Sequence, residues 1–215
     1  DLDRQATEVT QMSLYIKILE TIAEEPSITI GYRNAILPKL SDNIKHGNSL
    51  VDVDYYDMFP EEQHNTIQSH IRPFNWKHSF PAIFKKGGFD AVIGNPPYGA
   101  LYSEKIIEYL KKSYKSYTLN GESYVLFIQL TTNITKNNSH IGVIIPDTLL
   151  NLGFTQKIRS HILENTKILE IYQLHKNVFQ NVTVDTLLLF LIKSFQKHEY
   201  FSGKYLQKFW FFSSS

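Results

Sequence analysis

Between Asp90 and Ile192 the chain alternates between two hydrophobic periods, and this alternation restricts the fold more than any other feature. Apolar runs typical of strands occur at residues 90–94, 141–145, 168–174 and 183–192. Segments with helical periodicity occur at residues 103–115, 122–134 and 155–163. Strands that alternate with helices indicate a parallel sheet covered on both faces, and the last two strands have no room for a helix between them. We therefore predict an α/β fold: a doubly wound, mainly parallel sheet with an antiparallel hairpin at its edge.

The amino-terminal part of the chain follows a less regular pattern. A predicted helix carries apolar residues at helical spacing, namely Val9, Met12, Ile16 and Leu19, and Pro26 closes it. Residues 44–50 resemble a short strand. Residues 52–88 are polar and aromatic, with several prolines and the pair Gly87-Gly88, which predicts a long surface excursion with one short helix near residues 61–71.

Composition limits the class of protein. The chain has 215 residues, of which 42% are hydrophobic, so it can bury the core of one domain or slightly more. Its 22 basic and 21 acidic residues create no basic field, so any binding of nucleic acid would use local patches or another domain. The absence of cysteine excludes disulfides and fits a cytoplasmic protein of bacterial type. The longest apolar run, residues 187–192, is far too short to cross a membrane.

Several other kinds of site receive little support. The eight histidines lack the spacing of metal ligands, so we expect no metal site, and the chain contains neither a glycine-rich phosphate loop nor a nucleophile elbow. A group of cationic and aromatic residues either follows a nucleic-acid backbone or forms the solvated face of a helix. This group consists of Lys111, Lys112, Tyr114, Lys115 and Tyr117.

A rigid polar loop follows the strand predicted at residues 90–94. Its sequence is Asn95-Pro96-Pro97-Tyr98, and its two prolines fix two φ angles and remove two N–H donors. The Asn95 side-chain oxygen and a neighbouring carbonyl can accept both hydrogens of an exocyclic amine or a carboxamide, and Tyr98 offers a face for stacking. Such a loop at the carboxyl end of a strand indicates a catalytic site. The alternative is that the tetrapeptide is a turn that ends the strand.

The segment FDAVIGNPPYG resembles motif IV of the amino-methyltransferases that use S-adenosyl-L-methionine. Its longer version, FPAIFKKGGFDAVIGNPPYG, is similar to type IIG restriction-modification enzymes and related adenine-N6 DNA methyltransferases. Other segments resemble further parts of that family: DLDRQA, HGNSL, ESYVLFIQ, IGVIIPDTLL, ILEIYQL and VFQNVTVDTLLLFLIK. The resemblance implies a class I methyltransferase fold at residues 1–195, with an insertion at about 52–88 and a tail at 196–215.

The resemblance also implies roles for individual residues. Asn95, Pro96, Pro97 and Tyr98 match the catalytic loop. Asp1 matches the acid that binds the cofactor ribose, Asn48 stands where the family binds the cofactor's adenine, and Phe179 matches the aromatic residue that stacks on the flipped base, as Tyr98 does. Asn95 also borders the cofactor. The alternatives are a solvated Asp1, an ordinary turn at Asn48 and a core position for Phe179.

The function implied by the resemblance is methyl transfer to the N6 amine of a flipped adenine in double-stranded DNA, within a restriction-modification enzyme. Alternatives are a methyltransferase for protein glutamine or RNA bases, and a non-catalytic remnant that binds DNA. The chain opens at Asp1 without an initiator methionine, and the family's glycine-rich first motif would precede it, so we expect a fragment that is inactive alone. Nuclease and target-recognition domains would lie outside it.

Overall fold

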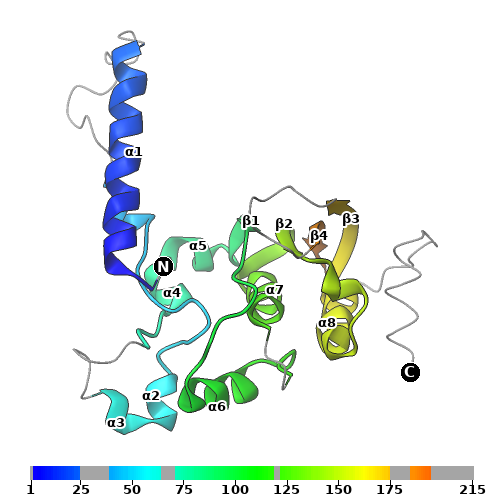
Figure 1. The fold of residues 1–215 in the computed structure, drawn as a ribbon. Helices are drawn as coiled ribbons and strands as arrows, with labels where there is room; N and C mark the ends of the chain where they lie inside the picture. The colour runs from blue at the N-terminus through cyan, green and yellow to red at the C-terminus, as the bar shows by residue number, and fades with distance from the viewer. Residues whose placement is uncertain (1, 25–38, 64–70, 119–121, 175–184, 195–215) are drawn as a thin grey trace. The chain divides into compact units, whose positions relative to one another are not determined.

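The computed structural model describes residues 2–24, 39–63, 71–118, 122–174 and 185–194 (Figure 1). The chain divides into two compact units, Asp1–Asn75 and Trp76–Ser215. Each unit is considered by itself below.

The second unit contains a mixed four-stranded sheet with the order β1-β2-β4-β3. Strand β1 (Phe89–Gly94) pairs in parallel with β2 (Thr135–Pro146). Strand β4 (Thr186–Lys193) runs antiparallel to both β2 and β3 (Thr166–Leu174), so β1, β2 and β3 share one direction. The predicted α/β fold with an antiparallel hairpin at the edge is therefore confirmed, and β3 is the outer strand of that hairpin.

Alternation along β2 and β4 builds the core on one face of this sheet. The apolar core side chains of these two strands are Ile141, Val143, Ile145, Leu187, Leu189 and Leu191. Helix α7 (Ser123–Ile134) contacts β2, α8 (Gln156–Asn165) contacts β3, and the two helices contact each other, so both cover this face. Apolar side chains from both helices complete the core, and their burial is the main stabilising term.

The opposite face of the sheet keeps access to solvent. Ile93, Gly142 and Phe190 lie across three strands on this face, and Ile93 is 87% exposed while Phe190 is 39% exposed. Tyr172 on β3 is 57% exposed. The described helices α7 and α8 therefore cover one face, where the sequence pattern had predicted cover on both.

Local sequence signals explain where the helices begin. Helix α6 (Glu104–Ser113) starts after Ser103, whose side chain accepts a hydrogen bond from the Ile106 amide. Helix α7 is apolar around most of its circumference, which suits a helix buried between the sheet and α8. Helices α6, α7 and α8 all lie within two residues of the predicted boundaries.

An aromatic cluster leads the chain into β1. Helices α4 (Trp76–Ser79) and α5 (Pro81–Lys85) contribute Trp76, Phe80 and Phe84, whose rings lie 5.3–5.9 Å from the ring of Phe89. Between α5 and β1, Gly88 has a φ of +125°, and a Cβ atom there would lie 2.4 Å from the Ile134 carbonyl oxygen. The start of β1 and the junction of α7 with β2 thus approach so closely that a side chain does not fit.

The first unit is built on helix α1 (Arg4–Glu24) and a loop core. The Asp3 carboxylate accepts a hydrogen bond from the Gln5 amide and so caps α1. The predicted apolar stripe of α1 is exposed, since Val9 and Met12 are 64% and 66% exposed. A small core forms instead around Leu50, Val51, Tyr55, Ile71 and Phe74.

Two predictions for residues 44–88 were wrong. Residues 44–50 form a loop with a single isolated bridge between Asn48 and Pro73, because Gly47 has a φ of +152° and the Asn48 side chain makes a turn. The excursion is more ordered than expected: helices α2 (Tyr55–Met58) and α3 (Pro60–Gln63) precede α4 and α5, and Tyr55 is fully buried. The helix predicted near residues 61–71 overlaps α3, and residues 64–70 lie outside the described part of the chain.

Replacing Gly88 by alanine should destabilise the protein strongly. The new Cβ meets backbone atoms that cannot move aside, so we expect a loss of at least roughly 1–3 kcal/mol in the free energy of unfolding. Denaturant unfolding of Gly88→Ala in the full-length protein measures this loss. Gly153→Ala is the control, since a Cβ there has no neighbour within 4 Å. Equal stability of the two variants would contradict the close approach.

Candidate functional site

The loop Asn95-Pro96-Pro97-Tyr98 lies directly after β1, at its carboxyl end. Pro96 is buried while Asn95 is exposed, so the loop is anchored by a proline and presents an amide. The glycines on either side, Gly94 and Gly99, have open space where a Cβ would lie. The side-chain amide of Asn95 is therefore accessible to a ligand.

Tyr98 contacts Asn95 directly. Its hydroxyl donates a hydrogen bond of 3.3 Å to the Asn95 side-chain oxygen, and its ring packs against the core. Burial raises the pKa of Tyr98 above its ordinary value of 10.0, so the hydroxyl remains a neutral donor near pH 7. The structure thus brings together the two side chains that the sequence predicted for catalysis.

A buried serine holds the exit of this loop. Ser123, the first residue of α7, is fully buried, and its hydroxyl oxygen accepts a hydrogen bond of 2.6 Å from the Ala100 amide. Ser123 also hydrogen-bonds the hydroxyl of Tyr102, which opposes the rise that burial causes in the pKa of Tyr102. Two residues just after the loop are therefore fixed to the amino end of a core helix.

The loop after β2 lies at the same edge of the sheet, since β1 and β2 are parallel neighbours. The Tyr124 hydroxyl is 3.1 Å from the Thr148 hydroxyl, and burial raises the pKa of Tyr124 to about 12. Partial burial also raises the pKa of the Glu122 carboxyl. The surroundings of α7 therefore contain neutral hydroxyl groups and a carboxyl group, that of Glu122, whose pKa is raised.

An arginine with no exposed surface holds that second loop from within. Arg159 on α8 donates hydrogen bonds to the carbonyl oxygens of Leu149 and Leu152, at 2.9 and 3.0 Å. The Thr155 hydroxyl lies within hydrogen-bonding distance of the same two carbonyls. The backbone after β2 is therefore held by side chains of the α8 region.

Asn48, predicted to bind the cofactor's adenine, lies in the first unit. Asn48 is 8% exposed, and its side-chain oxygen accepts a hydrogen bond of 3.1 Å from the backbone amide of Leu50. The backbone amide of Asn48 donates a hydrogen bond of 2.7 Å to the backbone carbonyl of Arg72. The turn that the sequence offered as an alternative is therefore present. An amide oxygen has two acceptor positions, so the cofactor role stays a prediction.

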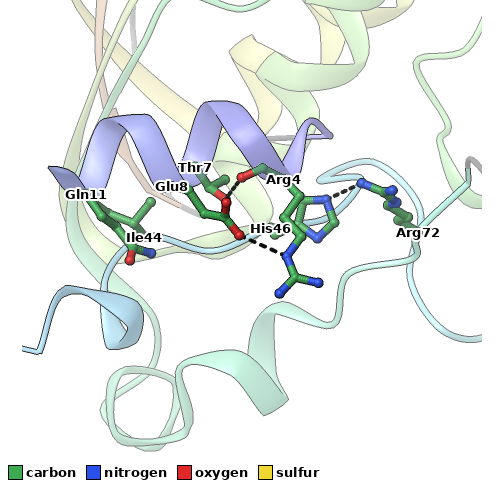
Figure 2. A pocket seen from close by; sticks show the side chains of 7 residues that line it. All are labelled: Arg4, Thr7, Glu8, Gln11, Ile44, His46 and Arg72. Carbon is green, nitrogen blue, oxygen red and sulfur yellow. Dashed lines mark hydrogen bonds and ion pairs between the residues drawn. The ribbon is translucent and has the colours of Figure 1, made fainter. Parts of the chain in front are cut away.

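The first unit also contains an open hollow of about 550 Å³ (Figure 2). Its lining combines charged and polar side chains with one apolar residue: Arg4, Thr7, Glu8, Gln11, Ile44, His46 and Arg72. On its α1 side, Arg4 forms an exposed ion pair with Glu8, one helical turn further along. No motif in the sequence pointed to this hollow, because its residues come from three separate segments.

Other predicted residues have different outcomes. Asp1 and Phe179 lie outside the described residues, and their roles stay predictions. Lys112 pairs with Glu108 on an exposed face, and Tyr114 is buried and offers no stacking surface, which favours the solvated-face interpretation of this segment. Sequence reasoning missed Ser123, Tyr102 and Arg159. The segment ESYVLFIQ, which contains Ser123, was the available signal for the first of these.

Metal-binding clusters and membrane-spanning helices are both absent from the described part of the chain. No group of three or more His, Cys, Asp or Glu residues there could hold a metal ion. Within the same residues, no helix has both the length and the apolar character needed to span a membrane.

The described sheet is α/β and carries an exposed side-chain amide, Asn95, on a proline-stiffened loop at the carboxyl end of a strand. The chain belongs to the Eco57I restriction-modification methylase family, which it matches over residues 1–179. Restriction-modification methylases use S-adenosyl-L-methionine, so the predicted class of cofactor is confirmed for the family.

Two relatives illustrate the match. The type II restriction enzyme and methyltransferase RM.Eco57I of Escherichia coli is 32% identical over 212 residues, which are 94% of this chain and 19% of that protein. A putative type II restriction enzyme and methyltransferase of Methanocaldococcus jannaschii is 32% identical over 129 residues, 60% of this chain and 11% of that protein. The chain therefore spans about a fifth or less of these relatives.

Solved structures overlap with parts of the chain. The cryo-EM structure of the DrdV–DNA complex has a TM-score of 0.48 and 14% identity, covering 72% of this chain and 17% of that chain. A putative class I S-adenosylmethionine-dependent methyltransferase of Listeria monocytogenes has a TM-score of 0.43 and 23% identity. The match covers 50% of this chain and 32% of that chain. The family assignment rests on the sequence match.

Replacing Ser123 by alanine should slow methyl transfer. The backbone amide of Ala100 loses its acceptor and the loop Asn95-Pro96-Pro97-Tyr98, predicted to be catalytic, loses its fixed exit, so we expect the single-turnover rate in the full-length protein to fall about tenfold with DNA affinity unchanged. Measurements are made well below the unfolding temperature.

Ser116→Ala serves as the control for this experiment. Ser116 is also buried, and its hydroxyl has no hydrogen-bond partner among the described residues. If Ser123→Ala lowers the melting temperature but leaves the rate at the level of Ser116→Ala, Ser123 stabilises the fold without positioning the loop.

Proposed function

We propose that the protein containing this chain transfers a methyl group to the N6 amine of a flipped adenine in double-stranded DNA, within a restriction-modification enzyme. The observation that carries the proposal is the exposed Asn95 amide, held beside Tyr98 at the carboxyl end of β1 in a chain of the Eco57I family. The proposal treats residues 1–195 as a partial methyltransferase core with an insertion at about 52–88.

Asn95 would act by accepting hydrogens of the target amine. Its side-chain oxygen and the Pro96 carbonyl lie on one short loop, and two acceptors favour a pyramidal nitrogen whose lone pair faces the methyl group. The Tyr98 hydroxyl already donates to this oxygen at 3.3 Å, and the oxygen keeps a second acceptor position for the amine. Pro96 and Pro97 limit the motion of the loop, which keeps the acceptors aligned.

Tyr98 and Phe179 would hold the flipped base. A base removed from the duplex loses its stacking neighbours, and an aromatic ring replaces roughly 1–3 kcal/mol of that stacking. The Tyr98 ring is half-buried and packed against the core, so its orientation is limited before a base arrives. Phe179 enters this proposal from the sequence alone.

When bound, S-adenosyl-L-methionine supplies the activated methyl group. The chain's own contribution would come from Asp1 on the ribose hydroxyls, from Asn48 on the adenine, and from Asn95 at the border of the site. The second acceptor position of the Asn48 oxygen fits an amine donor, since the Leu50 amide uses one position.

DNA is the substrate supported by the family, whose members belong to restriction-modification systems. The chain carries a net charge of +1, so most of the contacts to DNA phosphates would come from other parts of the protein, including proposed target-recognition and nuclease domains. Adenine is favoured over other targets by the segment FPAIFKKGGFDAVIGNPPYG, which resembles adenine-N6 enzymes.

Replacing Asn95 by alanine should abolish most of the methyl transfer. Loss of one acceptor aimed at the transition state costs roughly 3–4 kcal/mol, so the single-turnover rate in the full-length protein should fall by two or more orders of magnitude. DNA affinity should change little. Labelled cofactor and a panel of DNA, RNA and glutamine-containing protein substrates measure both the rate and the target.

The control is Asn137→Ala, the same change at an exposed position near the amino end of β2. An Asn95→Ala rate within threefold of this control would remove Asn95 from the chemistry. Label that appears on RNA or protein and not on DNA adenine would replace the proposed substrate.

A further inference from the structure

We propose that Arg72 is a positioning residue for the cofactor site, because it joins the two loops that carry the predicted cofactor contacts. The inference rests on the proposed function of Asp1 and Asn48. Arg72 belongs to the excursion between the recognised motifs, so neither the sequence pattern nor the family resemblance assigned it a role. All the contacts that follow lie within the first unit.

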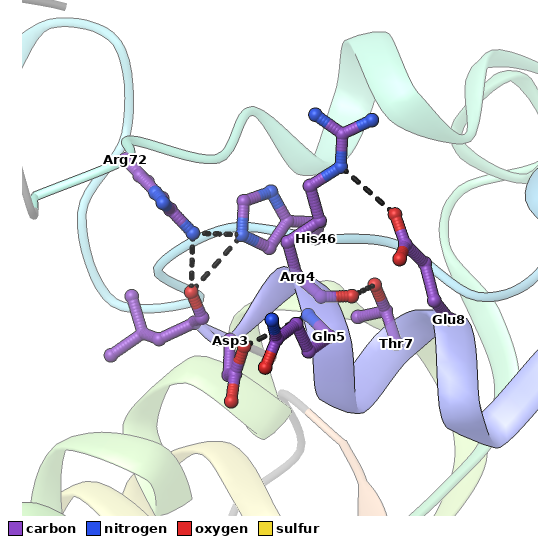
Figure 3. A network of polar contacts seen from close by, with 8 residues as sticks. Asp3, Arg4, Gln5, Thr7, Glu8, His46 and Arg72 are labelled. Atoms are coloured by element: carbon purple, nitrogen blue, oxygen red, sulfur yellow. Dashed lines mark hydrogen bonds and ion pairs between the residues drawn. The ribbon is translucent and has the colours of Figure 1, made fainter. Parts of the chain in front are cut away.

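Arg72 contacts both loops at once. Figure 3 shows its guanidinium beside His46. Its guanidinium Nη1 donates a hydrogen bond of 2.8 Å to the carbonyl oxygen of Leu2, the residue after Asp1. Its backbone carbonyl accepts a hydrogen bond of 2.7 Å from the backbone amide of Asn48. One residue therefore connects the chain beside the predicted ribose acid to the predicted adenine residue.

The backbone of Arg72 is held in an unusual conformation. Its φ is 44°, in the left-handed region that non-glycine residues seldom adopt, and it precedes Pro73, which favours extended geometry. Neighbouring contacts hold it there, namely the bridge between Asn48 and Pro73 and the hydrogen bond from the Phe74 amide to the Val51 carbonyl. Strain of this kind persists where the surrounding structure requires it and is frequent at ligand sites.

His46 supports Arg72 in either of its neutral forms. Its Nε2 lies 3.0 Å from the Leu2 carbonyl oxygen and also contacts Nη1 of Arg72. With a hydrogen on Nε2 the ring donates to Leu2, and without it the ring accepts from Arg72, so the two contacts alternate. The hydrogen bond from Arg72 to the Leu2 carbonyl forms with either tautomer of His46, because the guanidinium is always a donor.

The consequence concerns affinity for the cofactor. If Leu2 moves away from Asn48, the two segments that carry the proposed cofactor contacts are no longer held together. Binding then requires ordering of two independent segments, which costs affinity. Loss of the Arg72 side chain should therefore weaken binding of S-adenosyl-L-methionine without affecting the catalytic loop on β1.

The test uses the full-length protein and measures three quantities for each variant: the Kd for S-adenosyl-L-methionine by calorimetry without DNA, the Kd for DNA, and the melting temperature. Arg72→Asn is the main variant, because asparagine tolerates a positive φ but is too short to reach Leu2. Arg72→Lys restores a charged donor. Arg4→Asn is the control, since it removes the same charge from an exposed ion pair that does not involve Leu2.

We expect Arg72→Asn to weaken cofactor binding about tenfold, which corresponds to the loss of one hydrogen bond from a charged group. Arg72→Lys should recover part of this loss, and Arg4→Asn should bind as the wild type does. Affinity for DNA should stay constant in all variants. The single-turnover rate at saturating cofactor should also stay within about threefold of wild type, since the catalytic loop is unchanged.

Two outcomes separate this inference from the proposed function. If the wild type binds the cofactor and Arg72→Asn binds equally well, Arg72 is at most a structural residue and the inference is overturned, whatever happens to the melting temperature. If the wild type shows no binding of S-adenosyl-L-methionine, the proposed function itself fails, and the inference fails with it.

Discussion

The parallel pairing of β1 with β2 is the constraint on which the candidate site depends. It places the loop Asn95–Tyr98 and the loop after β2 at one edge of the sheet. The pairing needs the chain to enter β1 close to the junction of α7 and β2, and the lack of a side chain at Gly88 allows this approach. Burial of the alternating side chains of β2 and β4 then stabilises the sheet that carries the loop.

Rigidity of the loop arises from three independent sources. The two prolines limit its backbone angles, the buried Pro96 and the packed Tyr98 ring attach it to the protein interior, and Ser123 holds its exit. The Asn95 amide stays exposed among these fixed groups. Such preorganisation avoids the entropy cost of ordering an acceptor when the substrate arrives, which is the physical basis of an efficient transfer site.

The predictions from sequence succeeded where hydrophobic periodicity and burial agreed. Strands β1 and β3 and helices α6, α7 and α8 follow strong patterns, and each appears close to its predicted bounds, whereas β2 begins at Thr135, well before the predicted start at residue 141. Periodicity failed at residues 44–50, where Asn48 forms a side-chain turn, and in the excursion, where Tyr55 is buried in the short helix α2 and Phe74 is buried in a loop. Apolar content alone cannot separate a buried loop from a strand, because both hide their side chains.

The sequence by itself determined the class of fold, the family and the identity of the Asn95-Pro96-Pro97-Tyr98 loop, since these depend on local order along the chain. Tertiary structure decided which distant residues contact that loop and the segment at Leu2. Ser123 meets Ala100 across 23 positions, and Arg72 meets Leu2 across 70. Their side chains are ordinary in sequence, and they acquire a role through hydrogen bonds that exist after the chain has folded.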